Sequence, residues 1–237
     1  MSDGWSRCYQ ISANCTVSEF LSKRWYRLVF SLLELANVPF AGNRFLEVGC
    51  GKGGFCVFAS SLGVEALGLD AAKPAIKEVA QTGSGLFLVG DARALPLKQN
   101  QFDVVVCADV LEHISCYERA FAEMTRVCKK GGYLVFTTPT RTNVTEIFAP
   151  LFFFRRRFCM GENQPADVNN FSSSKLQLLC KQNNLKVLFE RGIGMVWLPT
   201  RNKRITMVLS RLEKPQAMFK NLCINIGVIA QKPRSNS

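Results

Sequence analysis

Between residues 44 and 139, five short apolar runs alternate with helical patterns, and this alternation restricts the possible folds more than any other feature of the chain. The runs typical of strands are RFLEVG, VEALGLD, LFLVGD, FDVVVCAD and YLVFTTP. The spacing of apolar residues predicts helices between them, over 54–62, 74–81 and 115–128. Strands that alternate with helices and are apolar on both faces form a parallel sheet that helices cover on both sides.

The flanking residues continue this pattern less regularly. Apolar residues at helical spacing predict an N-terminal helix over 17–35, and Ser172 is a suitable cap for a helix that runs to Gln182. Further strands are predicted in LKVLFERG and in LCINIGVIAQKP. The length of 237 residues suits one domain. We divide it into an N-terminal helical extension (1–40), a core (44–140), two basic aromatic segments (141–170 and 194–220) and a final strand (221–232).

A glycine-rich loop, in the stretch LEVGCGKGGF, directly follows the first predicted strand. It is not a Walker loop, because Lys52 is followed by glycine and not by serine or threonine. Gly49, Gly51 and Gly54 formally satisfy the dinucleotide fingerprint, and Asp70 lies at the expected distance to hold a ribose. The same loop also fits a second pattern, E-x-G-x-G-x-G, which starts at Glu47.

Polar residues follow several of the predicted strands. Asp70 ends the second strand, Asp91 follows the third, and Asp109 to His113 follow the fourth. In parallel sheets, ligands bind beyond the carboxyl ends of the strands. The positions therefore predict one ligand site that several strands share.

Four segments, in this order, resemble a class I S-adenosylmethionine-dependent methyltransferase of the group that includes the ubiquinone and menaquinone biosynthesis enzymes. They are LEVGCGKGGF, GLDAAKPAI, GDARALPLKQNQFDVVVCADVLEHI and RVCKKGGYLVFTTPT, and the resemblance covers about residues 44–140. It implies an α/β fold with a Rossmann-like, mainly parallel seven-stranded sheet whose last strand is antiparallel. It also implies S-adenosylmethionine as cofactor and S-adenosylhomocysteine as product.

The resemblance assigns expected roles to residues that match the family's motifs. The loop with Gly49, Cys50, Gly51 and Gly53 would let the backbone approach the methionine part and the ribose. Asp70, with Ala71 beside it, would accept the ribose hydroxyls, while Asp91 and Ala92 would hold the adenine. Glu47 would orient the amino end of the cofactor, and the carbonyl of Ala108 would accept from its ammonium group.

His113 is the candidate catalytic residue. It follows the fourth strand, where an acceptor must meet the methyl group, and a neutral imidazole can take a proton from a hydroxyl. The alternative is that His113 only orients the loop or caps the next helix, because methyl transfer to a good nucleophile requires chiefly alignment. We expect the neighbouring Glu112 to be structural.

Basic charge is concentrated in the second part of the chain. Residues 1–139 have a net charge of +1 and residues 140–237 a net charge of +11. Aromatic and basic side chains mix in residues 147–158 and 195–211. This mixture suits a cap that meets an anionic membrane, although a buried aromatic cluster beside solvated arginines is the plainer interpretation.

These features favour a small-molecule or lipid-linked acceptor, such as a quinone precursor or a glycolipid. RNA is the alternative acceptor, since arginines bind phosphates and aromatic rings stack on bases. The chain lacks the N/D-P-P-Y/F/W tetrapeptide of enzymes that methylate base amines. An alternative of another class is a partner or scaffold protein that binds the cofactor and transfers nothing.

The ten cysteines are scattered, none as C-x-x-C, and the chain has one histidine, so we expect no metal site. Such cysteines are typical of reduced, buried residues in a cytoplasmic protein. The N-terminus lacks the pattern of a signal peptide, and the most apolar run is too short to span a bilayer. A cytoplasmic protein, at most peripheral to a membrane, is expected.

Overall fold

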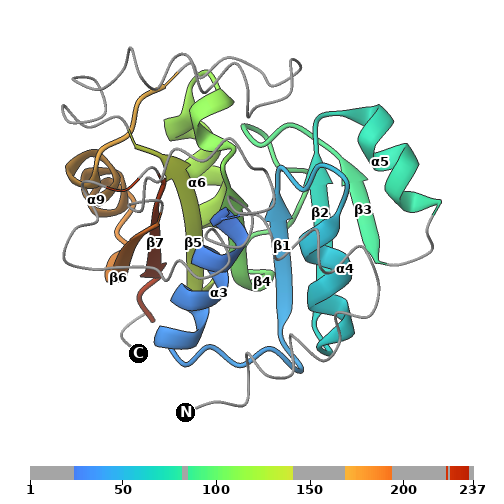
Figure 1. Cartoon of the computed structure of the whole chain (residues 1–237), viewed down its shortest axis with the longest axis horizontal. Helices are drawn as coiled ribbons and strands as arrows, with labels where there is room; N and C mark the ends of the chain where they lie inside the picture. Colours follow the sequence, from blue (N-terminus) through green and yellow to red (C-terminus); the bar gives the residue numbers. More distant parts are fainter. Residues whose placement is uncertain (1–23, 82–84, 141–168, 194–222, 224, 235–237) are drawn as a thin grey trace, which may run out of the picture.

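A seven-stranded sheet forms the centre of the molecule (Figure 1), with the strand order β3-β2-β1-β4-β5-β7-β6. The computed structural model describes residues 24–81, 85–140, 169–193, 223 and 225–234. The strands are β1 (Arg44–Val48), β2 (Glu65–Asp70), β3 (Leu86–Val89), β4 (Phe102–Ala108), β5 (Cys128–Pro139), β6 (Lys186–Ile193) and β7 (Asn225–Gln231).

The sheet is mainly parallel, as predicted. Strands β1 to β5 pair in parallel, and β1 lies between β2 and β4, where Leu46 is opposite both Leu67 and Val105. Strand β7 runs antiparallel to both β5 and β6. The prediction of an antiparallel last strand is therefore confirmed, and the parallel strands all end at one edge, called here the carboxyl edge.

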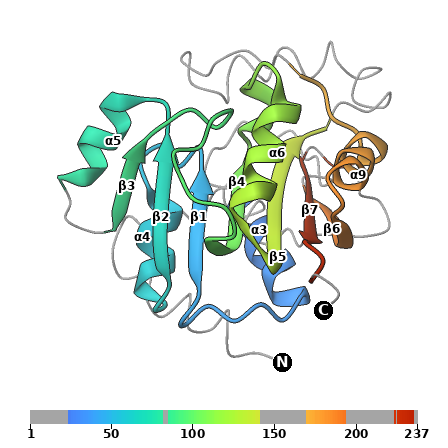
Figure 2. The same ribbon diagram turned by 180° about the vertical axis from the view of Figure 1, so that it is seen from behind.

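Helices cover both faces of the sheet. The helices are α3 (Arg24–Leu35), α4 (Gly54–Ser61), α5 (Lys73–Ala80), α6 (Tyr117–Val127) and α9 (Ser173–Gln182), with a short 3₁₀ helix, η1 (Leu111–His113). Helices α3 and α4 contribute to one hydrophobic core and lie in front of the sheet in Figure 1. Helices α6 and α9 contribute to the core on the other face, and Figure 2 shows α6 in front of β4 and β5.

Local sequence signals explain several of these boundaries. Helix α5 has a proline in its first turn, and the hydroxyl of Ser172 accepts a hydrogen bond from the Lys175 backbone N–H at 3.3 Å, which caps α9 as predicted. Strand β5 begins at Cys128, earlier than the predicted YLVFTTP. The Lys129 ammonium group pairs with the Asp103 carboxylate at 2.8 Å, which ties this basic stretch to β4 where the register between the two strands shifts.

Some predicted segments include residues that the structure does not describe. Residues 17–23 of the predicted N-terminal helix and nearly all of the two basic aromatic segments lie outside the described residues. Within the described part, the cysteines are free thiols, and all of them except Cys116 are buried. None of the helices described in the structure is long and apolar enough to cross a bilayer.

Candidate functional site

A cavity of about 360 Å³ opens at the carboxyl edge of the sheet, where β1, β2, β3 and β4 end. Six residues that the sequence analysis singled out line it: Gly49, Asp70, Ala71, Asp91, Ala92 and His113. The other lining residues are Val48, Leu69, Gly90, Arg93, Val110, Ile114 and Ser115. The structure thus brings the predicted polar residues of successive strands together around one space.

The glycine loop begins at the wall of this cavity, which its first glycine, Gly49, lines. Gly49, Gly51 and Gly53 have φ values of 78°, 51° and 70°, a left-handed conformation that side chains disfavour. A Cβ added to Gly49 would lie 2.3 Å from a methyl carbon of Val110, whereas one added to Gly51 would meet nothing within 4 Å. Gly49 is therefore required for packing, and at Gly51 the backbone faces open space.

The Asp70 carboxylate fixes the shape of the loop. One oxygen accepts a hydrogen bond from the Gly51 backbone N–H and the other from the Ala72 backbone N–H, each at 2.8 Å. Each carboxylate oxygen can accept a further hydrogen bond. Asp70 can therefore hold the loop and bind the hydroxyls of a ligand at the same time.

Asp91 lies at the cavity with a partner that the sequence analysis did not single out. Arg93 forms a bidentate ion pair with the Asp91 carboxylate, with distances of 2.7 to 3.1 Å, and donates to the Ser115 hydroxyl at 3.1 Å. Hydrogen bonds from Arg93 lower the pKa of Asp91 to about 2. Asp91 is therefore ionised, and can act only as an acceptor, throughout the physiological pH range. The D-x-R spacing was the signal that could have identified Arg93.

Glu47 does not line the cavity. Its side chain is buried beneath the loop, where the carboxylate accepts from the Tyr26 hydroxyl at 3.0 Å and lies 3.4 Å from the Cys56 sulfur. Burial, together with the charge of Glu47, raises the pKa of Tyr26 and of Cys56. The Tyr26 contact joins residues 21 positions apart, and no local sequence pattern indicates it.

Ala108 is buried at the end of β4, outside the residues that line the cavity. The next residue, Asp109, has a left-handed φ of 53°. Its carboxylate accepts from the Thr137 hydroxyl at 2.7 Å and from the Asn225 side-chain amide at 2.8 Å. Asp109 therefore ties β4 to β5 and β7 beside the cavity. Cys50, Gly51 and Gly53 belong to the loop but do not line the cavity.

His113 lies in η1 and lines the cavity with a side chain that is 22% exposed. Its Nε2 is 3.9 Å from a carboxylate oxygen of Glu112. The Glu112 side chain is 2% exposed, and it accepts from the Thr138 hydroxyl at 3.3 Å. Glu112 thus connects η1 to β5, which supports its expected structural role. Of the two residues, His113 is the one that lines the cavity.

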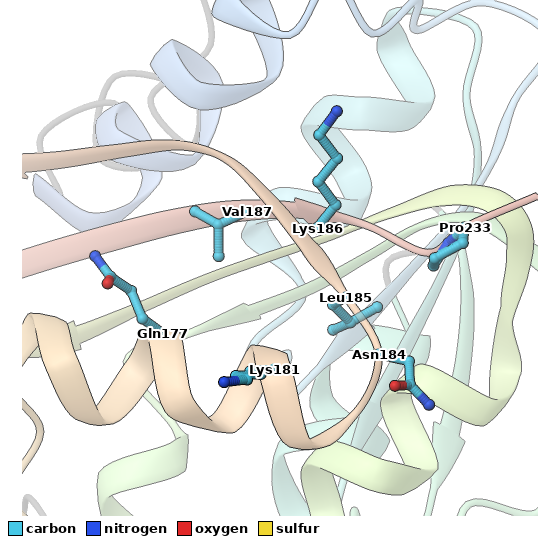
Figure 3. A pocket seen from close by; sticks show the side chains of 7 residues that line it. All are labelled: Gln177, Lys181, Asn184, Leu185, Lys186, Val187 and Pro233. Atoms are coloured by element: carbon cyan, nitrogen blue, oxygen red, sulfur yellow. The ribbon is translucent and has the colours of Figure 1, made fainter.

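A larger hollow of about 770 Å³ lies at the opposite edge of the sheet (Figure 3). It is lined by Gln177 and Lys181 of α9, Lys186 and Val187 at the beginning of β6, and by Asn184, Leu185 and Pro233. None of the predicted site residues lies there. Since ligands of such sheets bind at the carboxyl edge, we assign the chemistry to the smaller cavity.

Comparison with known proteins identifies similar chains and a matching family model. Residues 46–136 match the family model described as "Methyltransferase domain". The chain is 35% identical over 141 residues to a demethylmenaquinone methyltransferase of Renibacterium salmoninarum, covering 56% of this chain and 58% of that protein. It is 30% identical over 115 residues to a ubiquinone biosynthesis O-methyltransferase of Bordetella bronchiseptica, covering 46% and 48%. The chain thus spans about half the length of these relatives.

Solved structures share the fold at lower sequence identity. In the complex between the Haloferax volcanii Trm112 methyltransferase activator and its methyltransferase, one chain superposes on this structure with a TM-score of 0.64. The two are 16% identical, and the match covers 92% of this chain and 94% of that chain. This similarity concerns the Rossmann-like fold.

Proposed function

We propose that this chain, whose residues 46–136 form a methyltransferase domain of the class I, Rossmann-like type, transfers a methyl group from S-adenosylmethionine to a small or lipid-linked acceptor. S-adenosylmethionine is the cofactor of this family and fold, and S-adenosylhomocysteine is the product. The observation that carries the proposal is the cavity at the carboxyl edge, where the glycine loop, Asp70 and Asp91 meet.

The residues around the cavity suit this cofactor. Its volume of about 360 Å³ is within the range of small-molecule sites. We assign the ribose to Asp70, whose oxygens have lone pairs left over after binding the loop. Asp91, ionised and partly exposed, would accept from the exocyclic amine of adenine, with Ala92 beside the ring. The loop would lie along the methionine part.

When bound, the cofactor supplies a methyl group on a sulfonium, which an acceptor atom attacks in line while the sulfur keeps the electron pair. The protein would contribute alignment of the two reactants and exclusion of water. Val110 and Ile114 give the cavity apolar walls next to His113. We assign to His113, which lines the cavity, the role of taking a proton from the acceptor.

Replacing His113 by alanine is expected to lower kcat about a hundredfold, the usual contribution of a general base. The Kd for S-adenosylhomocysteine should stay within about threefold, because the imidazole is assigned to the acceptor and not to the cofactor. Single-turnover assays with the identified acceptor, together with calorimetry, would measure both. Full turnover in the variant would show that His113 only orients η1.

The acceptor assignment is supported by where the two basic segments attach. Thr140 pairs with Phe171, and its hydroxyl donates to the carbonyl of Cys223. Ile193 pairs with Asn225, and the Asn169 backbone N–H donates to the carbonyl of Glu112 at 3.0 Å. Residues 141–168 and 194–222 therefore leave and rejoin the described fold at the carboxyl edge. We assign to them the role of a cap over the acceptor that meets an anionic membrane.

This assignment predicts binding to vesicles that contain anionic lipid, and weaker binding as salt screens the charges. Reversing two charges, Lys203→Glu and Arg204→Glu, should weaken the binding at least about tenfold, since each basic residue near such a surface contributes about 1 kcal/mol. Flotation assays would measure it. The matched control is Lys130→Glu with Lys186→Glu, two exposed lysines at the opposite edge of the sheet. Equal loss in both double variants would contradict a dedicated membrane face.

The experiment that tests the function is methyl transfer from labelled S-adenosylmethionine into a whole-cell extract, followed by partition. Label in the organic phase is expected, for a quinone-like or glycolipid-like acceptor handled by a cytoplasmic, peripheral enzyme. Label in a ribonuclease-sensitive aqueous fraction would instead establish RNA as acceptor. No transfer by a protein that binds the cofactor would favour the scaffold alternative.

A further inference from the structure

The carboxylate of Glu47 receives a contact from a different helix on each of its oxygens. Tyr26 of α3 donates its hydroxyl to one oxygen at 3.0 Å, and the Cys56 thiol of α4 lies 3.4 Å from the other. The three residues are buried, with exposed fractions of 6% for Tyr26, 1% for Glu47 and 0% for Cys56. Since the pKa of both the phenol and the thiol is raised, both groups stay protonated and donate.

These contacts hold the glycine loop at both of its ends. Glu47 precedes Gly49 by two residues, and Cys56 lies in the first turn of α4, which begins at Gly54. Three residues between them, Gly49, Gly51 and Gly53, have a left-handed backbone conformation. Glycine reaches this conformation because it has no side chain, and for the same reason its backbone is the least restricted of all residues. The shape of this loop therefore depends on how firmly its two ends are held.

Tyr26 adds a connection from outside the loop. Helix α3 packs against β5, β6 and β7, the half of the sheet from which the two basic segments depart. The Tyr26 ring also stacks on Phe55 of α4, with ring centroids 6.0 Å apart. Its hydroxyl thus connects α3, which packs against β5, β6 and β7, to Glu47 of β1 at the base of the glycine loop.

We infer that Tyr26 is a positioning residue for the methionine end of the cofactor. Through its hydrogen bond to Glu47, it holds the glycine loop in the shape that receives the amino-acid part of S-adenosylmethionine. Hydrogen bonds to a buried carboxylate are strong, and the loss of one donor weakens the hold on the carboxylate and on the loop that follows it. The inference rests on the proposed function, because it concerns the same cavity.

The test is Tyr26→Phe, which removes the hydroxyl and keeps the ring on Phe55. Two ligands are titrated by calorimetry: S-adenosylhomocysteine, and 5′-methylthioadenosine, which lacks the amino-acid part. The Kd for S-adenosylhomocysteine should rise about tenfold, the effect of one charge-assisted hydrogen bond. The Kd for 5′-methylthioadenosine should change less than about twofold. Tyr133→Phe, the same change in the middle of β5 opposite Val104 of β4, should alter neither.

Each other outcome overturns the inference. An equal rise in the Kd for both ligands would show that Tyr26 is a purely structural residue. Unchanged affinity for both would show that Tyr26 has no influence on the site. If the wild-type protein bound neither ligand, the proposed function itself would fail. Should Tyr26→Phe not fold, Cys56→Ala removes another donor to Glu47. The inference then requires that Cys56→Ala weakens the binding of S-adenosylhomocysteine more than the binding of 5′-methylthioadenosine.

Discussion

Replacing Asp70 by asparagine should weaken the binding of S-adenosylhomocysteine at least about a hundredfold. The carboxylate accepts hydrogen bonds from the backbone N–H groups of Gly51 and Ala72, and an amide must turn its NH₂ group toward one of these donors. The variant also loses the ionised acceptor for the ribose hydroxyls. Two hydrogen bonds to a charged group contribute about 3 kcal/mol together, which corresponds to about two orders of magnitude in Kd.

Asp103→Asn is the matched control for this prediction. Asp103 also accepts from a backbone N–H, that of Arg44 at 3.0 Å, and pairs with Lys129, but it lies at the beginning of β4, at the opposite edge of the sheet. Calorimetry should give this variant a Kd within about twofold of wild type. Unchanged affinity in Asp70→Asn would show that the ligand site is placed at the wrong residues.

Replacing Gly49 by alanine should lower the free energy of unfolding by about 2 to 4 kcal/mol. The new Cβ would lie 2.3 Å and 2.7 Å from the two methyl carbons of Val110, and such overpacking costs about 1 to 3 kcal/mol. The left-handed φ of 78° adds about 1 kcal/mol for a residue with a side chain. Relief of the clash would push the loop or η1 into the cavity, so cofactor binding should be lost as well.

Gly42→Ala separates the clash from the backbone strain. Gly42 has nearly the same φ, 79°, but an added Cβ would meet nothing within 4 Å. Urea unfolding should show a loss of only about 1 kcal/mol for Gly42→Ala. Equal losses in the two variants would mean that Val110 does not pack against the loop as the structure has it.

The sequence predicted most of the sheet because its strands are marked locally. Apolar runs ended by glycine or aspartate gave β1, β2 and β4 nearly to the residue, since a buried parallel strand has few other compositions. The beginning of β5 could not be predicted in this way. KKGG is typical of a turn, and Gly131 has a left-handed φ of 80°, but the stretch is held within β5 by the ion pair of Lys129 with Asp103 and by the hydrogen bond from the Gly131 N–H to the Lys232 carbonyl.

The candidate site could be predicted where its residues follow the strands. Asp70, Asp91 and His113 converge because the ends of parallel strands meet at one edge of the sheet. The placement of Glu47 could not be predicted in the same way. Its direction depends on Tyr26 and Cys56, which come from two helices, and only the packed structure brings these together. Arg93 was missed although it is close in sequence to its partner, because arginine at a surface usually has no defined partner.

The proposed function requires that the cavity at the carboxyl edge binds S-adenosylmethionine. Calorimetric titration of the full-length protein with S-adenosylhomocysteine tests it most directly. We expect one site per chain with a Kd in the micromolar range, typical of enzymes and their small substrates, and no measurable binding in the same range for Asp70→Asn. Absence of binding by the folded wild-type protein would contradict the claim, as would equal binding by the two proteins.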